Sequence, residues 1–146
     1  MAASFCYAEA ARGFLNGEID VNAATVKAVL CMSSTTADTD YDATDVSAMT
    51  LDEYDGAGYT AGGHTLTIAA PAADGTGQGG FASAVVTALT ILNLGAGTRD
   101  LAGVLFSITS LTPDMPLCWL DYGGADQPDG TNWTLASIKL KGATTS

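Results

Sequence analysis

Apolar and polar residues alternate in short stretches along most of the chain, and this pattern predicts a β-rich protein. Residues 25–32 carry apolar side chains on both sides of the expected strand, which is typical of a strand that is covered on both faces. Turns or loops rich in glycine, proline and aspartate separate the stretches, at residues 72–80, 94–97, 112–114 and 123–130. Further strands are expected at residues 64–70, 82–93, 103–109, 116–122 and 132–141.

A helix is expected at residues 4–16, where apolar residues recur at helical spacing. Ser4 can cap its start, and Gly17 follows at the position usual for a left-handed C-terminal cap. A short, alanine-rich helix needs a docking surface to persist, which its own core or another subunit can supply. The residues expected on one face of the helix are Phe5, Ala8, Ala11 and Leu15.

A long acidic loop is expected at residues 33–57, and residues 47–54 can form a helical turn within it. A loop of this length is more often functional or interface-forming than idle. Residues 142–146 are expected to form a polar tail. We therefore predict a single domain over residues 1–146, mainly β: an antiparallel β-sandwich or jelly-roll-like barrel with a short N-terminal helix.

Charge limits the classes of partner. The chain has 16 acidic residues against five basic ones, for a net charge of −11, so neither direct nucleic-acid binding nor attraction to an anionic membrane is expected. Charged residues make up only 14% of the chain, where about 25% is usual, and this suits a protein that lives inside an assembly. For a particle component, acidity favours the outer surface over the DNA-lined interior.

The cysteines Cys6, Cys31 and Cys118 are widely spaced and contain no CxxC pair. We expect buried, reduced thiols, with a disulfide or metal framework as the alternative. The N-terminus lacks the basic and apolar regions of a signal peptide, and no apolar run reaches the length of a membrane span. Synthesis in a cytoplasm is therefore expected.

The sequence offers little chemistry. The acidic run from Asp38 to Asp45 resembles a calcium loop, but the sixth and twelfth positions hold Ala43 and Met49 instead of glycine and glutamate. We expect a solvated acidic loop there, with a looser calcium site as the alternative. The single histidine, His64, has no recognisable nucleophile motif to serve. We expect no catalytic residue, no metal, no cofactor and no enzymatic activity.

Glycines at residues 75–80 lack the lysine of a phosphate-binding loop, so a flexible hairpin loop is expected there. Aromatic residues are the better candidates for function, because tyrosine and tryptophan often carry subunit interfaces. Trp119, Tyr122 and Trp133 are expected in strands, as core or interface anchors, with a glycan platform as the alternative. The predicted interface residues are Phe5, Tyr7, Phe14, Tyr41, Tyr54, Tyr59, Trp119 and Trp133.

Several segments occur in a characteristic order: Tyr7 followed by ARGFLNGEID (11–20), TVKAVL (25–30), an acidic loop, GYTAGGHTL (58–66), GVLF (103–106) and PLCWLDYGG (116–124). In this order they resemble small structural proteins of tailed bacteriophages and prophages. The resemblance covers about residues 7–140.

The resemblance implies a virion component, a capsid cement or decoration protein on the outer shell. Such a protein is expected to form a homo-trimer and to bridge subunits of the major capsid protein, its partner. Contacts are expected from the N-terminal helix, the acidic loop and exposed aromatic residues. The alternatives are an adaptor in the neck, tail or baseplate of the virion, and a glycan- or receptor-binding module.

Overall fold

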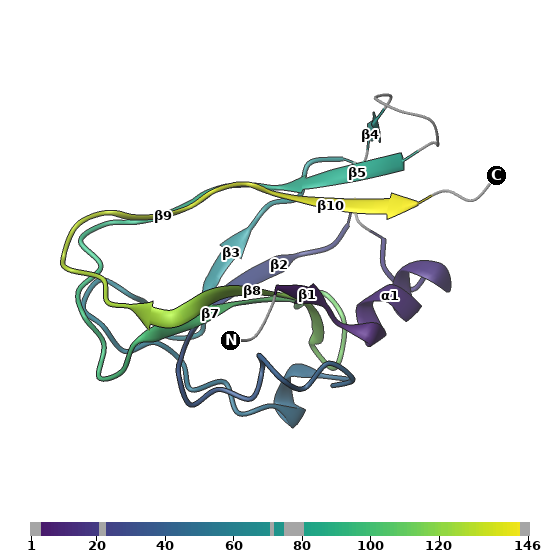
Figure 1. Cartoon of the computed structure of the whole chain (residues 1–146). Coiled ribbons are helices and arrows are strands. Elements are labelled where there is room, and N and C mark those ends of the chain that lie inside the picture. Colours follow the sequence, from purple (N-terminus) through teal and green to yellow (C-terminus); the bar gives the residue numbers. More distant parts are fainter. Residues whose placement is uncertain (1–3, 21–22, 71, 75–80, 144–146) are drawn as a thin grey trace.

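The computed structural model describes residues 4–20, 23–70, 72–74 and 81–143, and within these ranges the chain is mainly β (Figure 1). The elements in chain order are β1 (Phe5–Cys6), α1 (Ala8–Leu15), β2 (Val26–Met32), the 3-10 turn η1 (Val46–Ala48), β3 (His64–Leu66), β4 (Ala72–Asp74), β5 (Phe81–Val86), β6 (Leu89–Ile91), β7 (Leu101–Ile108), β8 (Met115–Asp126), β9 (Trp133–Leu135) and β10 (Ile138–Ala143). The sheets are antiparallel and the domain is β-sandwich-like, which confirms the predicted fold class.

The central sheet has the strand order β1-β8-β7-β2-β3. Its middle strands β2 and β7 pair from Val26 opposite Ile108 to Cys31 opposite Gly103. All eight residues of β7 are buried, and β2 is buried along nearly its whole length. The predicted burial of the first strand on both faces is therefore confirmed.

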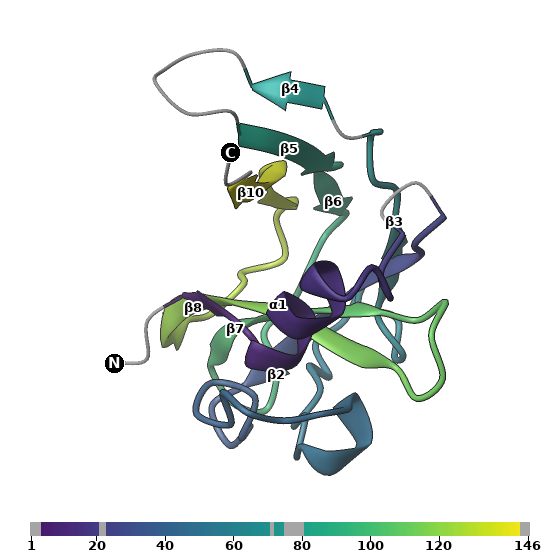
Figure 2. The same ribbon diagram turned by 90° about the vertical axis from the view of Figure 1, so that its right-hand side faces the viewer.

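The two faces of the central sheet are covered in different ways. Figure 2 shows strands β5, β6 and β10 on one side of it and the loop that follows β2 on the other. On the loop side, Ala37, Ala43 and Met49 pack in a cluster with Trp119 and Leu105 of the sheet. The acidic loop thus covers this face of the central sheet, and its buried residues are apolar except for Thr35, which is 8% exposed.

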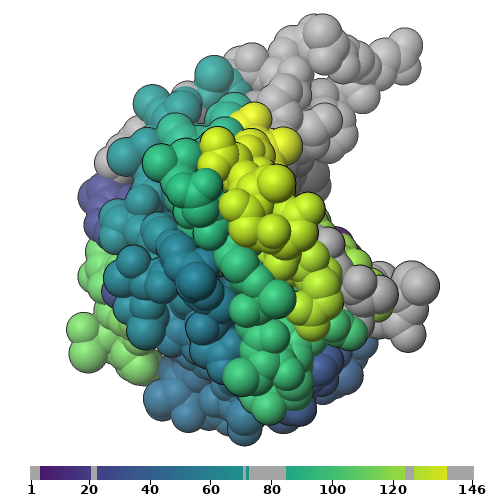
Figure 3. All heavy atoms as spheres, turned by 90° about the vertical axis from the view of Figure 1, so that its left-hand side faces the viewer, coloured from purple at the N-terminus to yellow at the C-terminus, as the bar shows by residue number. Residues whose placement is uncertain are grey.

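The strands on the first side form one ribbon. β5 pairs with β10 and β6 pairs with β9 in a single continuous register, from Phe81 opposite Ala143 to Ile91 opposite Trp133. The strand pairs are interrupted only at residues 87–88 and 136–137. The segments around β6 (green) and β9 (yellow) lie side by side in Figure 3. The four strands therefore form one continuous two-stranded ribbon.

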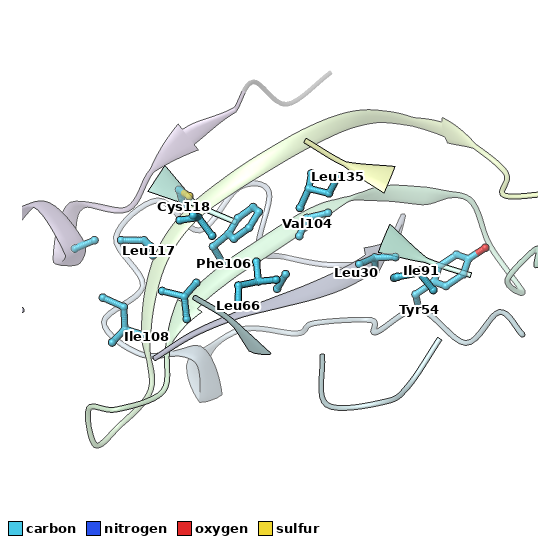
Figure 4. Packing of buried hydrophobic residues seen from close by; sticks show 14 of the residues in the cluster. Leu30, Tyr54, Leu66, Ile91, Val104, Phe106, Ile108, Leu117, Cys118 and Leu135 are labelled. Carbon is cyan, nitrogen blue, oxygen red and sulfur yellow. The ribbon is translucent and has the colours of Figure 1, made fainter. Parts of the chain in front are cut away.

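The main core lies between the central sheet and the β6–β9 half of this ribbon. Leu135 and Ile91 contribute from the ribbon, and Val104 and Phe106 from β7 (Figure 4). All four side chains are at most 3% exposed. Because buried apolar side chains supply the dominant favourable term in folding, this layer holds the ribbon on the sheet.

Several element boundaries differ from the predictions. The helix does not begin at Ser4: residues 5–6 form β1, and Ser4 Oγ instead accepts a hydrogen bond from the N–H of Asp121 at 3.0 Å. Helical spacing cannot reveal this, because the pairing of Phe5 with Trp119 is long-range. The predicted C-terminal cap is confirmed, since Gly17 has a φ of 71°.

The later strands also need correction. The turn predicted at residues 123–130 begins later, because β8 continues to Asp126, with Gly123 at a φ of 80°. The strand predicted at 64–70 ends at Leu66, with one further bridge at Ile68. The single strands predicted at 82–93 and 132–141 are each two strands. The predicted loop at 72–80 includes β4, the tail includes the end of β10, and residues 75–80 and 144–146 lie outside the described residues.

Candidate interaction surface

Helix α1 packs on the domain through its smallest residues. Ala10 and Gly13 are buried, and a Cβ at Gly13 would lie only 2.9 Å from Cδ1 of Ile19 and 3.3 Å from the sulfur of Met115. The absence of a side chain at position 13 therefore lets the helix approach these two residues closely. The side of α1 that faces the domain is the one with the least side-chain volume.

The opposite side of α1 is exposed and carries the apolar residues Ala8, Ala11 and Leu15 together with Arg12. Leu15 is 88% exposed, and Phe14, at the edge of this side, is 38% exposed. We call Ala8, Ala11, Phe14 and Leu15 the α1 surface. Because Ala8, Ala11 and Leu15 lie on one helical face, this is the face predicted to pack, either on the chain's own core or on another subunit. None of them belongs to a core cluster of the described residues.

A hollow of about 420 Å³ adjoins α1, lined by Glu9, Arg12, Glu18, Thr44, Leu111, Thr112, Pro113 and Met115. Arg12 donates hydrogen bonds to both oxygens of Glu18 at 2.8 Å and forms an ion pair with Glu9. These hydrogen bonds from Arg12 are the main cause that lowers the pKa of each glutamate. With its guanidinium shared by two carboxylates, the hollow carries net negative charge and does not suit an anionic ligand.

Arg99, the second arginine, is also paired. Its Nε donates to Oδ2 of Asp52 at 3.1 Å, and the same carboxylate accepts a hydrogen bond from the N–H of Ser34 at 2.8 Å. The hydrogen bond from Arg99 is the first cause that lowers the pKa of Asp52. Both arginines of the chain are therefore neutralised locally by carboxylates.

The Asp52 pair gives a pH prediction. A lowered folded-state pKa means that the pair stabilises the fold above the unfolded pKa of about 4, and that this contribution is lost as the pH falls through the folded pKa. Asp52→Asn is expected to lower the free energy of unfolding at pH 7 by about 1 kcal/mol, and the difference from the wild type should shrink towards acid pH. Urea unfolding of both proteins at pH 7 and at acid pH measures this difference, with Asp42→Asn in the same loop as the control. A difference that grows in acid would contradict the assignment.

Three of the predicted interface residues lie inside the chain. Tyr7, Tyr54 and Trp119 are at most 2% exposed. The hydroxyl of Tyr7 donates to the carbonyl of Ala37, and the hydroxyl of Tyr54 donates to the carbonyl of Gly95 at 2.8 Å. These rings anchor loops to the central sheet, so they present no surface to a partner. Residue type suggested an interface, but the long loops that cover them could not be placed from sequence.

The other predicted interface residues do not gather at one place. The rings of Phe5 and Tyr41 pack edge to face with their centroids 4.5 Å apart, and Tyr41 is 54% exposed. Trp133 is half-buried and packs beside Tyr122, with the two ring centroids 5.6 Å apart. Phe14 belongs to the α1 surface.

Tyr59, another of the predicted interface residues, lies in the glycine-rich segment at residues 58–63 and has a structural role. Its hydroxyl donates to Glu53 at 2.7 Å and accepts from the N–H of Leu30 at 3.3 Å. The same Glu53 oxygen accepts from the N–H groups of Gly62 and Gly63 at 2.6 and 3.1 Å. Burial is the main cause that raises the pKa of Tyr59. Glu53 could not be identified from the sequence, because a single glutamate in an acidic loop carries no recognisable pattern.

The candidates for chemistry remain isolated. His64 packs edge to face on Tyr59 at 5.5 Å, and its Nε2 has no hydrogen-bond partner among the described residues. Asp45 accepts a hydrogen bond from the N–H of Ala48 at 3.1 Å and so caps η1. In the described ranges, no three His, Cys, Asp or Glu side chains are grouped so that they could hold a metal ion. The same ranges contain no helix with the length and apolarity that crossing a membrane requires.

Comparison with known protein families, with curated proteins and with solved structures found no match to this chain. We therefore infer its function from its own residues, with the α1 surface as the candidate site.

Proposed function

We propose that this protein is a structural component of a tailed-bacteriophage particle that binds the outer surface of the major capsid shell and stabilises it by bridging capsid subunits, as a homo-trimer. The ordered segments described in the sequence analysis motivate the particle and the shell. The α1 surface is the observation that carries the binding role, because it is a mainly apolar helix face that the described residues leave uncovered.

The charge distribution supports the outer face of the shell. The chain has a net charge of −11, and both arginines are already paired with carboxylates. Phosphate backbones attract clustered basic groups, so an acidic protein of this kind avoids the packaged genome. Binding to a protein shell then has to come from apolar contact and shape rather than from general attraction of charges.

Binding of this kind stabilises a shell through mass action. A ligand that binds the assembled state, and not the disrupted one, shifts the equilibrium towards the assembled state. The interface between this protein and neighbouring capsid subunits would have to break before the shell could rupture. A decoration protein therefore needs an exposed binding face and a rigid body behind it. The α1 surface supplies the first, and the two-sided packing of the central sheet supplies the second.

Leu15→Glu tests the α1 surface. Burying a leucine side chain contributes about 1.5–3 kcal/mol, and 1.4 kcal/mol is a factor of ten in affinity, so the variant is expected to bind heads that lack the protein at least tenfold more weakly. Leu15 is 88% exposed, so the fold should be unaffected. The measurement is cosedimentation of the purified protein with such heads.

Leu92→Glu is the matched control, because Leu92 is also exposed, at 63%, and lies outside α1. It should bind as the wild type does. Equal binding by all three proteins would remove α1 from the interface, and failure of the wild type to bind would overturn the proposal.

The number of copies of the protein per particle decides its location. One to a few copies per capsid subunit supports the shell, and one copy per many subunits indicates an adaptor in the neck, tail or baseplate.

A further inference from the structure

Cys6 and Cys118 face each other across the antiparallel pair of β1 and β8. The N–H of Tyr7 donates to the carbonyl of Leu117 at 3.2 Å, immediately beside the two cysteines. A ladder bond at that position makes Cys6 and Cys118 a non-hydrogen-bonded pair, the type in which opposite side chains approach most closely. The Cα atoms of such pairs are about 4.5 Å apart, which lies within the range of about 4.4–6.8 Å that disulfides span.

The two thiols differ in exposure. Cys6 is exposed, whereas Cys118 is 8% exposed and packs in the main core, where Figure 4 shows it beside Phe106 and Leu117. Cys31 is fully buried, in the cluster on the opposite face of the central sheet. The chain thus places one accessible thiol directly opposite a sheltered one and keeps the third apart.

We propose that Cys6 and Cys118 form a redox-sensitive site that reacts with a low-molecular-weight disulfide, such as oxidised glutathione, and closes a cross-strand disulfide. The Cys6 thiolate attacks one sulfur of the small disulfide, forms a mixed disulfide and releases the first small thiolate. Cys118 then loses its proton and attacks Sγ of Cys6, which releases the second. Two protein thiols are oxidised, one small disulfide is reduced, and the two released thiolates take up the two cysteine protons.

Exposure sets the order of these steps. The nucleophile in thiol–disulfide exchange is the thiolate, and it must reach the small disulfide, so the exposed Cys6 reacts first. Burial is the main cause that raises the pKa of Cys118 to about 12. As long as the pH is below that value, each increase of one pH unit therefore raises the thiolate fraction of Cys118 about tenfold. Closure of the disulfide should accelerate accordingly as the pH rises.

The consequence is a covalent link between the N-terminal segment and the central sheet. β1 contains only two residues, and it directly precedes α1. A bond between positions 6 and 118 also closes most of the chain into one loop, which restricts the unfolded state. The oxidised protein should therefore hold β1, and with it the start of α1, more firmly than the reduced one.

The test is oxidation of the purified protein with oxidised glutathione at alkaline pH, followed by acid quenching, alkylation and digestion with trypsin. The cleavage sites place the three cysteines in different peptides, with Cys6 in residues 1–12, Cys31 in residues 28–99 and Cys118 in residues 100–139. The expected product has lost two hydrogens, links the first and third peptides, and carries alkylated Cys31. A stable glutathione adduct without this link, or a dimer joined through Cys6, would overturn the proposal.

Variants separate the steps. Cys118→Ala should stop at the glutathione adduct on Cys6, and Cys31→Ala should still form the linked product. Because Cys118 lies in the core, Cys6→Ser is the safer variant, and it should form neither the adduct nor the link.

Oxidised wild-type protein should unfold at a temperature about 5–10 °C above that of the reduced form, and adding dithiothreitol should reverse this difference. No such difference should occur in Cys6→Ser, and equal unfolding temperatures in the wild type would contradict the link.

Discussion

Replacing Trp119 with alanine is expected to lower the free energy of unfolding by about 3–5 kcal/mol, the usual range for removing a large aromatic side chain from a core. Trp119 is 1% exposed and is the largest fully buried side chain of the described residues. It sits where β8, the acidic loop and the N-terminal segment meet, in a cluster with Tyr7 and Met49. Because folded domains are stable by only about 5–15 kcal/mol, the variant should be close to unfolding at 37 °C.

Urea unfolding followed by circular dichroism measures this loss, and Trp133→Ala is the matched control. Trp133 is only half-buried, at the edge of the main core, so its loss should cost clearly less. Trp119→Phe should recover most of the stability, because the indole N–H of Trp119 has no hydrogen-bond partner among the described residues and its removal leaves nothing unpaired. If Trp119→Ala and Trp133→Ala lost equal stability, the acidic loop would not be a packed layer.

The strands at the centre of the sheet could be predicted because their apolar pattern is local. Residues 25–32 show apolar character on both faces, and β2 is covered on both faces by the ribbon and the loop. The identity of the second cover could not be predicted. Ala37, Ala43 and Met49 are spaced irregularly in a polar stretch, and only the folded chain brings them onto one surface.

The packing face of α1 also could not be predicted from the apolar pattern. Ala8, Ala11 and Leu15 form the more conspicuous apolar face, but α1 packs through Ala10 and Gly13 instead. Close approach to Ile19 requires a residue without a side chain, and hydrophobic periodicity gives glycine no weight. The mismatch between the face that the pattern favours and the face that packs is what identifies the α1 surface.

The positions of the aromatic residues that were predicted to form the interface were the hardest to infer from the sequence. Residue type places tyrosine and tryptophan either at interfaces or in cores, and the choice depends on what the loops cover. Tyr54 is enclosed because Gly56 and Gly97 lie against its ring, where any Cβ would come within 2.8 Å of a ring carbon. Glycines of this kind look like ordinary turn residues in the sequence. Their role as walls around a ring appears only in the structure.

Gly56→Ala is accordingly expected to cost about 2–3 kcal/mol, as overpacking of a closed site does. A Cβ at position 56 would lie 2.2 Å from the carbonyl oxygen of Gly95 and 2.4 Å from Cε1 of Tyr54. The hydroxyl of Tyr54 donates to that same carbonyl, and the N–H of Gly95 donates to Ala57 at 2.8 Å. The added methyl group therefore pushes apart the Tyr54 ring, the Gly95 backbone and the Ala57 backbone, which these hydrogen bonds hold together. None of the three is the free end of a flexible side chain.

Gly123→Ala is the control for this variant, because Gly123 has a φ of 80° and no atom within 4 Å of an added Cβ. It should cost only the roughly 1 kcal/mol of a left-handed alanine. Steric crowding also predicts coupling: in the double variant with Tyr54→Leu, the two losses measured by urea unfolding should sum to less than their separate values. Strict additivity would mean that the ring of Tyr54 is not what Gly56 makes room for. The cost of Gly56→Ala would then have to come from the Gly95 carbonyl alone.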